Sequence, residues 1–448
     1  MSNPDRLPHV VIVGGGFAGL WATRALARDA VRITLVDRGN HHLFQPLLYQ
    51  VATAGLSAPD IAAPLRHILR GQRNVEVRLA EVHGIDRTSK TLTLADGDTL
   101  DYDTLVLASG ATHAYFGNDQ WAAHAPGLKT LDDALRLRRK LLLAFERAEA
   151  ETDPARCAAW LSFAIVGGGP TGVELAGTLA EIARHTLRSE FRNIDPALAR
   201  VRLIEAGPRV LSSFPDDLSE RARRQLEKLG VEVLTGTPVG DIDAEGFRLG
   251  DTHVPARTIV WAAGVAASPL GALLDAPRDR AGRVQVEPDL RVPGLPDVFV
   301  AGDLASVQCD GRPVPGVAPA AKQMGRHVAA AIRARLRGEP TRPFVYRDFG
   351  NLATIGRMAA VVHLGRLKLS GVVAWWFWLI AHVFFLIGFR NRVVVLLNWT
   401  WAYWSYQRAA RIIFGPPDDV GSRAPEADTP AAEHAGPRTD ARADGRIG

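Results

Sequence analysis

Two glycine clusters, each followed by an acidic residue, form the strongest chemical pattern in this chain. GGGFAG occupies residues 14–19 and GGGPTG occupies residues 167–172, and each cluster directly follows a short apolar run. The next apolar run ends at Asp37 in the first case and at Glu205 in the second. Such a turn brings backbone N–H groups and a helix N-terminus up to a pyrophosphate, and the acid accepts a hydrogen bond from an adenosine ribose. The sequence therefore predicts two dinucleotide sites, an arrangement suited to electron transfer between two cofactors.

The second acid also predicts which nicotinamide dinucleotide binds. Glu205 can accept a hydrogen bond from a free ribose 2′-hydroxyl and repels a 2′-phosphate, which favours NADH over NADPH. Arg202 and Arg209 are close to Glu205 in the sequence, and they could weaken this preference by attracting the phosphate.

The glycine clusters need strands and helices to hold them, and the surrounding sequence supplies both. The first unit is predicted as strand 10–13, helix 20–28 and strand 31–37, and the second as strand 163–166, helix 172–189 and strand 201–205. Later strands are expected at 102–110, 258–264 and 297–303. We therefore predict an α/β fold with two Rossmann-like domains, the second inserted in the first. The predicted limits are 8–120 and 286–345 for the first domain and 121–285 for the second.

Composition and charge further limit the kinds of protein that this sequence can encode. The 448 residues are 47% hydrophobic, which is ordinary for a globular protein and can fill large cores. A net charge of +5, carried mostly by dispersed arginines, gives no reason to expect nucleic-acid binding. Cys157 and Cys309 are the two cysteines and form no metal or disulfide pattern. The first ten residues lack the apolar core of a signal peptide, so we expect folding to begin in the cytoplasm.

With these motifs, the sequence resembles the two-dinucleotide-binding flavoproteins, which include glutathione-reductase-like enzymes. The resemblance covers roughly residues 8–345, and Ala301-Gly302-Asp303 matches the second FAD motif of that family. It implies that the first glycine cluster binds FAD non-covalently and that the second binds the nicotinamide dinucleotide. The residues expected to bind FAD are Gly14, Gly15, Gly16, Phe17, Ala18, Gly19, Asp37, Arg38, Val82, Ser109, Gly110, Gly302, Asp303 and Ala318. Those expected to bind NADH are Gly167, Gly169, Thr171, Gly172, Glu205 and Gly264.

Three further stretches are similar to type II NADH dehydrogenases. They are HHLFQPLLYQVATAGL at 41–56, GPTGVELAG at 169–177 and VAPAAKQMG at 317–325. The resemblance implies a functional role for Glu174, for which a simple first-turn acid is the alternative. It also implies that Gln323 lines a quinone pocket, whereas Pro319 replaces the other glutamine of the family.

The residue types in the sequence disfavour a thiol relay, a histidine base and a metal site. The stretch 41–50 contains no cysteine, so the thiol relay of disulfide reductases is excluded at this place. His41 and His42 are expected to pack near the flavin or to cap a turn, because hydride transfer to flavin needs no protein base. No His, Cys or Asp cluster has metal-binding spacing, and no metal site is predicted.

The C-terminal part changes in character. Apolar, tryptophan-rich segments run over 372–389 and 393–414. Three alternatives remain: a transmembrane hairpin, helices lying in one leaflet, or a buried dimer interface. Arginines on both sides of a hairpin and polar residues in the second segment favour the one-leaflet arrangement. We therefore expect a membrane-associated region at 346–414 and a disordered tail at 415–448, which is rich in Pro, Ala, Asp, Arg and Gly.

Together these features predict an enzyme that oxidises NADH through FAD and reduces a membrane quinone without pumping protons. Its expected partners are NADH, quinone and a lipid bilayer surface, with a homodimer as an open alternative. The expected location is the cytoplasmic face of the bacterial inner membrane, peripheral or monotopic. The alternatives are an NADH-dependent ferredoxin or rubredoxin reductase, and a flavin-based redox sensor or interaction protein.

Overall fold

The computed structural model describes residues 6–387, 389–405 and 410–413. The predicted disordered tail lies outside these residues. The first sheet has the strand order β20-β21-β9-β1-β2-β5 and is parallel except for β20. Its strands are β1 (His9–Val13), β2 (Arg32–Asp37), β5 (Val75–Leu79), β9 (Thr104–Leu107), β20 (Arg291–Val292) and β21 (Leu295–Val300). All five residues of β1 are buried, because a strand in the middle of a parallel sheet is covered on both faces.

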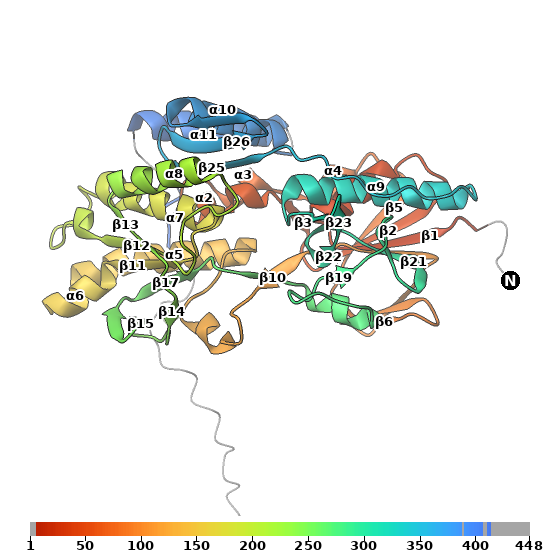
Figure 1. Cartoon of the computed structure of the whole chain (residues 1–448), viewed down its shortest axis with the longest axis horizontal. Helices are drawn as coiled ribbons and strands as arrows, with labels where there is room; N and C mark the ends of the chain where they lie inside the picture. The colour runs from red at the N-terminus through yellow and green to blue at the C-terminus, as the bar shows by residue number, and fades with distance from the viewer. Residues whose placement is uncertain (1–5, 388, 406–409, 414–448) are drawn as a thin grey trace, which may run out of the picture. The chain divides into compact units, whose positions relative to one another are not determined.

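The second sheet is parallel, with the order β13-β12-β11-β17. Its strands are β11 (Ser162–Val166), β12 (Arg200–Glu205), β13 (Val231–Thr235) and β17 (Thr258–Trp261). These strands come after β9 and before β20 in the chain, so the second α/β unit is inserted in the first, as predicted (Figure 1). The chain crosses between the units through β10 (Ala111–His113) and β18 (Val265–Ala267), which pair antiparallel. The residue limits proposed for the two domains remain predictions.

The two helices that follow the glycine clusters begin and end at other residues than the sequence predicts. Helix α1 covers Phe17–Ala25 and α7 covers Pro170–Glu181, so both begin inside the glycine cluster. The helix predicted to continue to residue 189 instead ends at Glu181 and is followed by a π-helical turn, Ile182–Thr186. Pro170 is compatible with its place because a proline in the first turn loses no helical hydrogen bond.

The C-terminal region contains a sheet and two helices. A three-stranded antiparallel sheet comprises β25 (Asn351–Gly356), β26 (Ala359–Leu364) and β27 (Leu367–Ser370). It is followed by α10 (Val372–Phe385) and α11 (Phe389–Ser405), and it is preceded by α9 (Ala318–Leu336). None of the helices that the structure describes combines the length and the apolar character needed to cross a bilayer.

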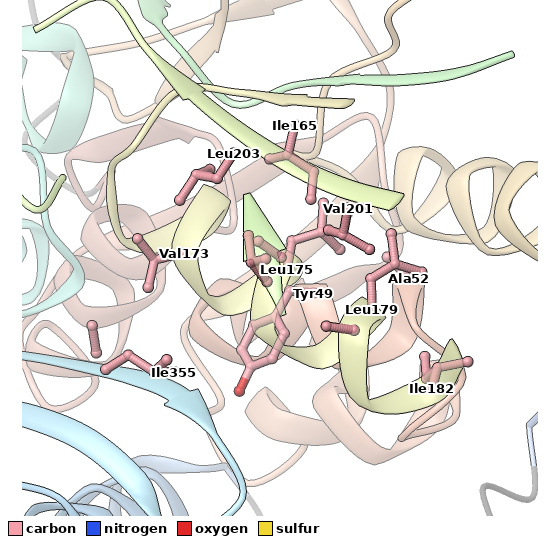
Figure 2. Close-up of a cluster of buried hydrophobic side chains, with 14 of the residues drawn as sticks. Tyr49, Ala52, Ile165, Val173, Leu175, Leu179, Ile182, Val201, Leu203 and Ile355 are labelled. Carbon is pink, nitrogen blue, oxygen red and sulfur yellow. The ribbon is translucent and has the colours of Figure 1, made fainter. Parts of the chain in front are cut away.

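The C-terminal sheet shares a core with the second α/β unit. Ile355 of β25 belongs to the same buried cluster as Val173 of α7 and Tyr49, as Figure 2 shows. The backbones of α7 and β25 approach each other closely, because a Cβ on Gly177 of α7 would overlap the carbonyl oxygen of Ile355. The first part of the region 346–414 therefore packs on the second α/β unit as a sheet, and the limits of the membrane-associated region remain a prediction.

Several short elements follow the second strand of the first unit. They are β3 (His41–Leu43), η1 (Gln45–Leu47), α2 (Leu48–Ala52), α3 (Ala58–Ile61) and β6 (Val82–Asp86). The long helix α5 (Leu131–Ala150) contributes to the core of the second unit.

Candidate active site

The first glycine cluster forms a turn closed by Asp37. Gly14 has φ +104°, a conformation that favours glycine, and a Cβ there would overlap the backbone of Ala108. Asp37 Oδ2 accepts a hydrogen bond from Gly15 N at 2.5 Å, and its Oδ1 accepts from Gly39 N at 2.7 Å. A Cβ on Gly16, in contrast, would meet nothing within 4 Å. The turn therefore leaves open space at Gly16, where a pyrophosphate can approach the helix N-terminus.

The second cluster repeats this geometry. Gly167 has φ +113°, and a Cβ there would meet the backbone of Ala262 and Ala263. Glu205 Oε2 accepts from Gly168 N at 2.5 Å, and Oε1 accepts from Gly207 N at 2.7 Å. Gly169 again has open space around it. The two turns thus share a middle glycine bonded to an acid and an open third glycine, as expected for two copies of one nucleotide-binding unit.

The other residues predicted to bind FAD come from neighbouring elements. Ser109 lies next to the Gly14 turn, and its buried Oγ has no hydrogen-bond partner among the described residues. A Cβ on Gly302 would contact Ala18 at 3.3 Å, and Ala318 starts α9. Ala80 N donates to Asp37 O, which brings the chain leading to Val82 beside the Asp37 strand end. An unpartnered buried hydroxyl and an open glycine turn fit a bound dinucleotide.

A cluster of aromatic side chains, which we call the aromatic group, lies beside this turn. His42 Nδ1 donates to Gly15 O at 2.9 Å, and its buried Nε2 is unpartnered among the described residues. Burial lowers the pKa of His42 to about 4, so the ring is neutral at physiological pH. The Phe17 ring lies 5.0 Å from His42 and 6.0 Å from Phe44, and Phe44 lies 6.3 Å from His382 of α10. His42 therefore holds the glycine turn, and the aromatic group joins it to the C-terminal helices. The His41 ring, in contrast, has Nδ1 at 3.1 Å from Asn40 Oδ1 and is not part of this group.

Glu174 is a buried acid in α7. It is 8% exposed, and its Oε1 accepts a hydrogen bond from Thr354 N of β25 at 3.4 Å. Burial raises the pKa of the Glu174 carboxyl well above its usual range. The alternative of a simple first-turn acid does not describe this geometry, because Glu174 faces a strand that comes 180 residues later. Its functional role remains a prediction.

We expect Glu174→Gln to remove a pH-dependent loss of stability. The folded-state pKa is above the unfolded one, so the stabilising contribution is complete below the unfolded pKa near 4.5 and is lost as the pH rises toward the folded pKa. A difference of one pH unit between the folded and unfolded pKa values corresponds to about 1.4 kcal/mol of unfolding free energy. The measurement is the Tm of the FAD-loaded protein from pH 5 to pH 8, where the variant should lose less stability than the parent. The control Glu146→Gln replaces an exposed acid and should follow the parent; an identical Glu174→Gln curve would exclude this interpretation.

Gln323 has partners that the sequence did not suggest. Its Nε2 donates to Arg347 O and its Oε1 accepts from Arg347 N, both at 2.9 Å. The side chain therefore holds the extended segment that leads to β25, and both ends of its amide are engaged. The quinone contact of Gln323 remains a prediction, and it requires this pairing to open. Pro319 lies in the first turn of α9, where a proline is tolerated.

Helices α10 and α11 (Figure 1) carry exposed apolar side chains, which we call the α10–α11 face. Its described members are exposed: Val372, Val373, Trp376, Phe377, Ile380, Phe384, Phe385, Val393, Leu396, Leu397 and Trp401. Lys322 and Arg392 lie at its edge, over the rings of Phe385 and Phe384 at 5.3 and 6.0 Å. Exposed apolar side chains on helices with basic residues beside them are typical of proteins that lie on a membrane.

Not every tryptophan in these helices lies on that surface. Trp378 is buried and lies 5.3 Å from Trp399, whose Nε1 donates to Gln50 Oε1 at 2.7 Å. Asn398 Nδ2 donates to Asp60 Oδ2 at 3.3 Å. Sequence reasoning missed Gln50 and Asp60, which hold α11 in place, because no local signal pairs them with residues so far along the chain. Trp378 and Trp399 therefore pack against the protein and are not part of the α10–α11 face.

Comparison with known proteins identifies the family. The sequence matches the pyridine nucleotide-disulphide oxidoreductase family over residues 8–325 and the NDH2 C-terminal domain over residues 349–404. It is 47% identical over 422 residues to the type II NADH:quinone oxidoreductase Ndh of Mycobacterium tuberculosis, covering 91% of this chain and 90% of that protein. The chain belongs to the type II NADH:quinone oxidoreductases.

Further relatives agree with this membership. The type II NADH:quinone oxidoreductase of Staphylococcus haemolyticus is 31% identical over 361 residues, covering 78% of this chain and 87% of that protein. A solved structure of NDH2 from Plasmodium falciparum matches with a TM-score of 0.83 over 92% of this chain and all of that one. At 20% identity, this likeness shows the fold. The family binds FAD, NADH and quinone, and the match over 349–404 spans β25–β27, α10 and most of α11.

Neither metal nor thiol chemistry is indicated by the site. The described residues contain no group of three or more His, Cys, Asp or Glu side chains that could hold a metal ion. Cys157 and Cys309 are free thiols, and burial raises the pKa of Cys157. A raised pKa disfavours the reactive thiolate.

Proposed function

We propose that this chain oxidises NADH and passes the electrons through FAD to a membrane quinone without transporting protons. The observation that carries the proposal is the repeated nucleotide-binding geometry. Two glycine turns, each bonded to its own acid, lie in one chain that also carries the α10–α11 face. FAD, when bound, supplies the hydride acceptor and the two-electron donor.

The residues of the chain hold the reactants in this proposal. The FAD turn is Gly14–Gly19 with Asp37, supported by Ser109, Gly302, Asp303 and the start of α9. The NADH turn is Gly167–Gly172 with Glu205 and Gly264. Burial raises the pKa of the Glu174 carboxyl well above its usual range, which favours its neutral form. The α10–α11 face holds the enzyme where long-tailed quinones are concentrated.

The choice of NADH over NADPH is supported by the arginines near Glu205. Arg202 Nε donates to Glu232 and its Nη1 donates to Ser162. Arg209 donates to the carbonyl oxygens of Ser212 and Phe214. Both guanidinium groups are thus engaged elsewhere, which leaves the Glu205 carboxylate as the charged group of its turn.

We therefore expect Glu205→Gln to reduce the preference for NADH. The change removes the repulsion of a 2′-phosphate and weakens a charge-assisted hydrogen bond, an effect of about 1.5–3 kcal/mol, or roughly ten- to a hundredfold in the ratio of kcat/KM values. The test is kcat/KM for NADH and NADPH with one quinone. The control Glu146→Gln replaces an exposed acid of α5 and should keep the parental ratio. An unchanged ratio in Glu205→Gln would mean that another residue reads the ribose.

The proposed location is the cytoplasmic face of the bacterial inner membrane, with the α10–α11 face in one leaflet. A homodimer that covers this face is the competing arrangement. Sedimentation of the purified protein with and without liposomes separates the two: a monomer that moves to the liposome fraction supports membrane binding, and a stable dimer that ignores liposomes opposes it.

The proposed function is tested with the full-length protein in sealed liposomes that contain quinone and an internal pH dye. We expect rapid NADH oxidation that depends on quinone and leaves the internal pH unchanged. Electron transfer to ferredoxin or rubredoxin in place of quinone would indicate the reductase alternative. Very slow turnover with every acceptor would indicate a redox sensor.

A further inference from the structure

Phe116 is an exposed aromatic residue in a strained turn. The residue is 71% exposed. Phe116 has φ +53° and the following Gly117 has φ +89°. Asn118 N donates to Tyr115 O at 3.0 Å and closes the turn. A turn with positive φ at both central residues favours Asn, Asp or Gly at the first of them, whereas a bulky aromatic residue is unfavourable there. The exposed ring gains little from the core in return, and backbone strain of this kind is typical of functional sites.

The tip of the Phe116 ring lies against Gly264. A Cβ on Gly264 would come within 2.6 Å of Phe116 Cζ, so a larger residue at this place would displace the ring. Ala114 N donates to Gly264 O at 3.3 Å, and Trp261 Nε1 donates to Ala114 O at 2.8 Å. The centroids of the Phe116 and Trp261 rings are 6.2 Å apart. The Phe116 ring is therefore located at the carboxyl end of β17, which ends at Trp261.

The order of the strands indicates which half of a dinucleotide passes this place. Strand β11 lies between β12 and β17, and the second glycine turn directly follows β11. A dinucleotide binds at the carboxyl ends of such strands with its pyrophosphate at the glycine turn. Glu205, at the end of β12, is the residue expected to hold the adenosine ribose. The nicotinamide half must then extend to the other side of the turn, toward β17 and Gly264. Phe116 is thus on the nicotinamide side, although sequence reasoning did not include it.

We propose that the Phe116 ring packs against the nicotinamide half of the bound dinucleotide. Contact with the ligand buries the exposed ring and offsets the strain of its turn, because flat aromatic surfaces attract one another and bury apolar area. Phe116 is then a binding residue that helps to place the nicotinamide, and the ring itself takes part in no chemical step. The inference rests on the proposed function for the binding of NADH at the second glycine turn.

The test is the equilibrium affinity of the full-length, FAD-loaded protein for NAD⁺ and for ADP, measured by titration calorimetry. ADP shares the adenosine and the pyrophosphate with NAD⁺ but lacks the nicotinamide half. Phe116→Asn removes the ring and suits the positive φ, so its Tm should be no lower than that of the parent. Its affinity for NAD⁺ should fall about tenfold, the effect of one lost aromatic contact, whereas its affinity for ADP should not change. Phe116→Tyr keeps the ring and should restore the affinity for NAD⁺.

Leu198→Asn is the matched control. Leu198 is 70% exposed and precedes β12, so it lies at the amino ends of the same strands. This variant should bind both ligands like the parent. An unchanged affinity of Phe116→Asn for NAD⁺ would overturn the proposal. So would an equal loss of affinity for NAD⁺ and ADP together with a lower Tm, since the ring would then support the fold. If the parent protein binds neither NAD⁺ nor ADP, the proposed function fails instead, and the two failures are thus distinguishable.

Discussion

Gly16→Val should yield a folded protein that does not retain FAD. A Cβ at this position meets nothing within 4 Å, so the apoprotein can accommodate the side chain. The valine instead occupies the space where the pyrophosphate approaches the helix N-terminus. Losing one or two charge-assisted hydrogen bonds there costs about 1.5–3 kcal/mol each, so FAD affinity should fall at least about tenfold. The measurements are the flavin content of the purified protein and its circular dichroism, which should remain that of the parent.

Gly169→Val is the matched variant in the second turn, where the surroundings are equally open. It should keep its FAD but be reduced slowly by NADH, with a raised KM. Gly19→Ala offers the opposite control, because its Cβ would overlap Gly14 O and should damage the fold itself. Full flavin content in Gly16→Val, or loss of FAD in Gly169→Val, would show that the two cofactors are assigned to the wrong turns.

A triple change on α10 should detach the enzyme from membranes without destroying it. Trp376, Ile380 and Phe384 recur every four residues on one side of the helix and are 52%, 64% and 66% exposed. Full burial of one large apolar side chain contributes roughly 1.5–3 kcal/mol. Replacing all three with serine should therefore weaken liposome binding at least about a hundredfold. Activity with a short-tailed, water-soluble quinone should be kept, whereas activity with a long-tailed quinone in liposomes should fall.

The control replaces three exposed leucines elsewhere, Leu7, Leu198 and Leu336, with serine. This variant loses similar apolar surface but should bind liposomes like the parent. Equal binding of both variants would mean that the α10–α11 face is not the membrane contact. Point changes are preferable to truncation, since a cut after Pro343 would remove Ile355, Val361 and Val362 from the main core.

The repeated nucleotide-binding units could be predicted from the sequence because their signals are local. A buried strand, a glycine cluster and an acid lie within about 40 residues, so the motif can be recognised from one short stretch of sequence. The structure adds what no local pattern contains. The hydrogen bonds of Asp37 and Glu205 to the middle glycines follow from tertiary folding, and so does the open space at Gly16 and Gly169.

The C-terminal part was predicted less well, because its structure depends on contacts between distant segments of the chain. Hydropathy marked residues 372–414 as apolar but could not tell Trp376, which is exposed, from Trp378, which is buried. The burial of Glu174 depends on β25, and the engagement of Gln323 depends on Arg347. These contacts join segments far apart in the chain, and family resemblance identified the residues without revealing their partners.

The most direct test is an anaerobic double-mixing experiment that follows the flavin absorbance. The purified protein is first mixed with one equivalent of NADH and then with quinone. We predict that NADH bleaches the flavin, that NADPH does so much more slowly, and that one equivalent of quinone restores the oxidised spectrum within the turnover time. A flavin that is reduced by NADH but stays reduced in the presence of quinone, and is reoxidised only by a protein acceptor, would contradict the assignment as an NADH:quinone oxidoreductase.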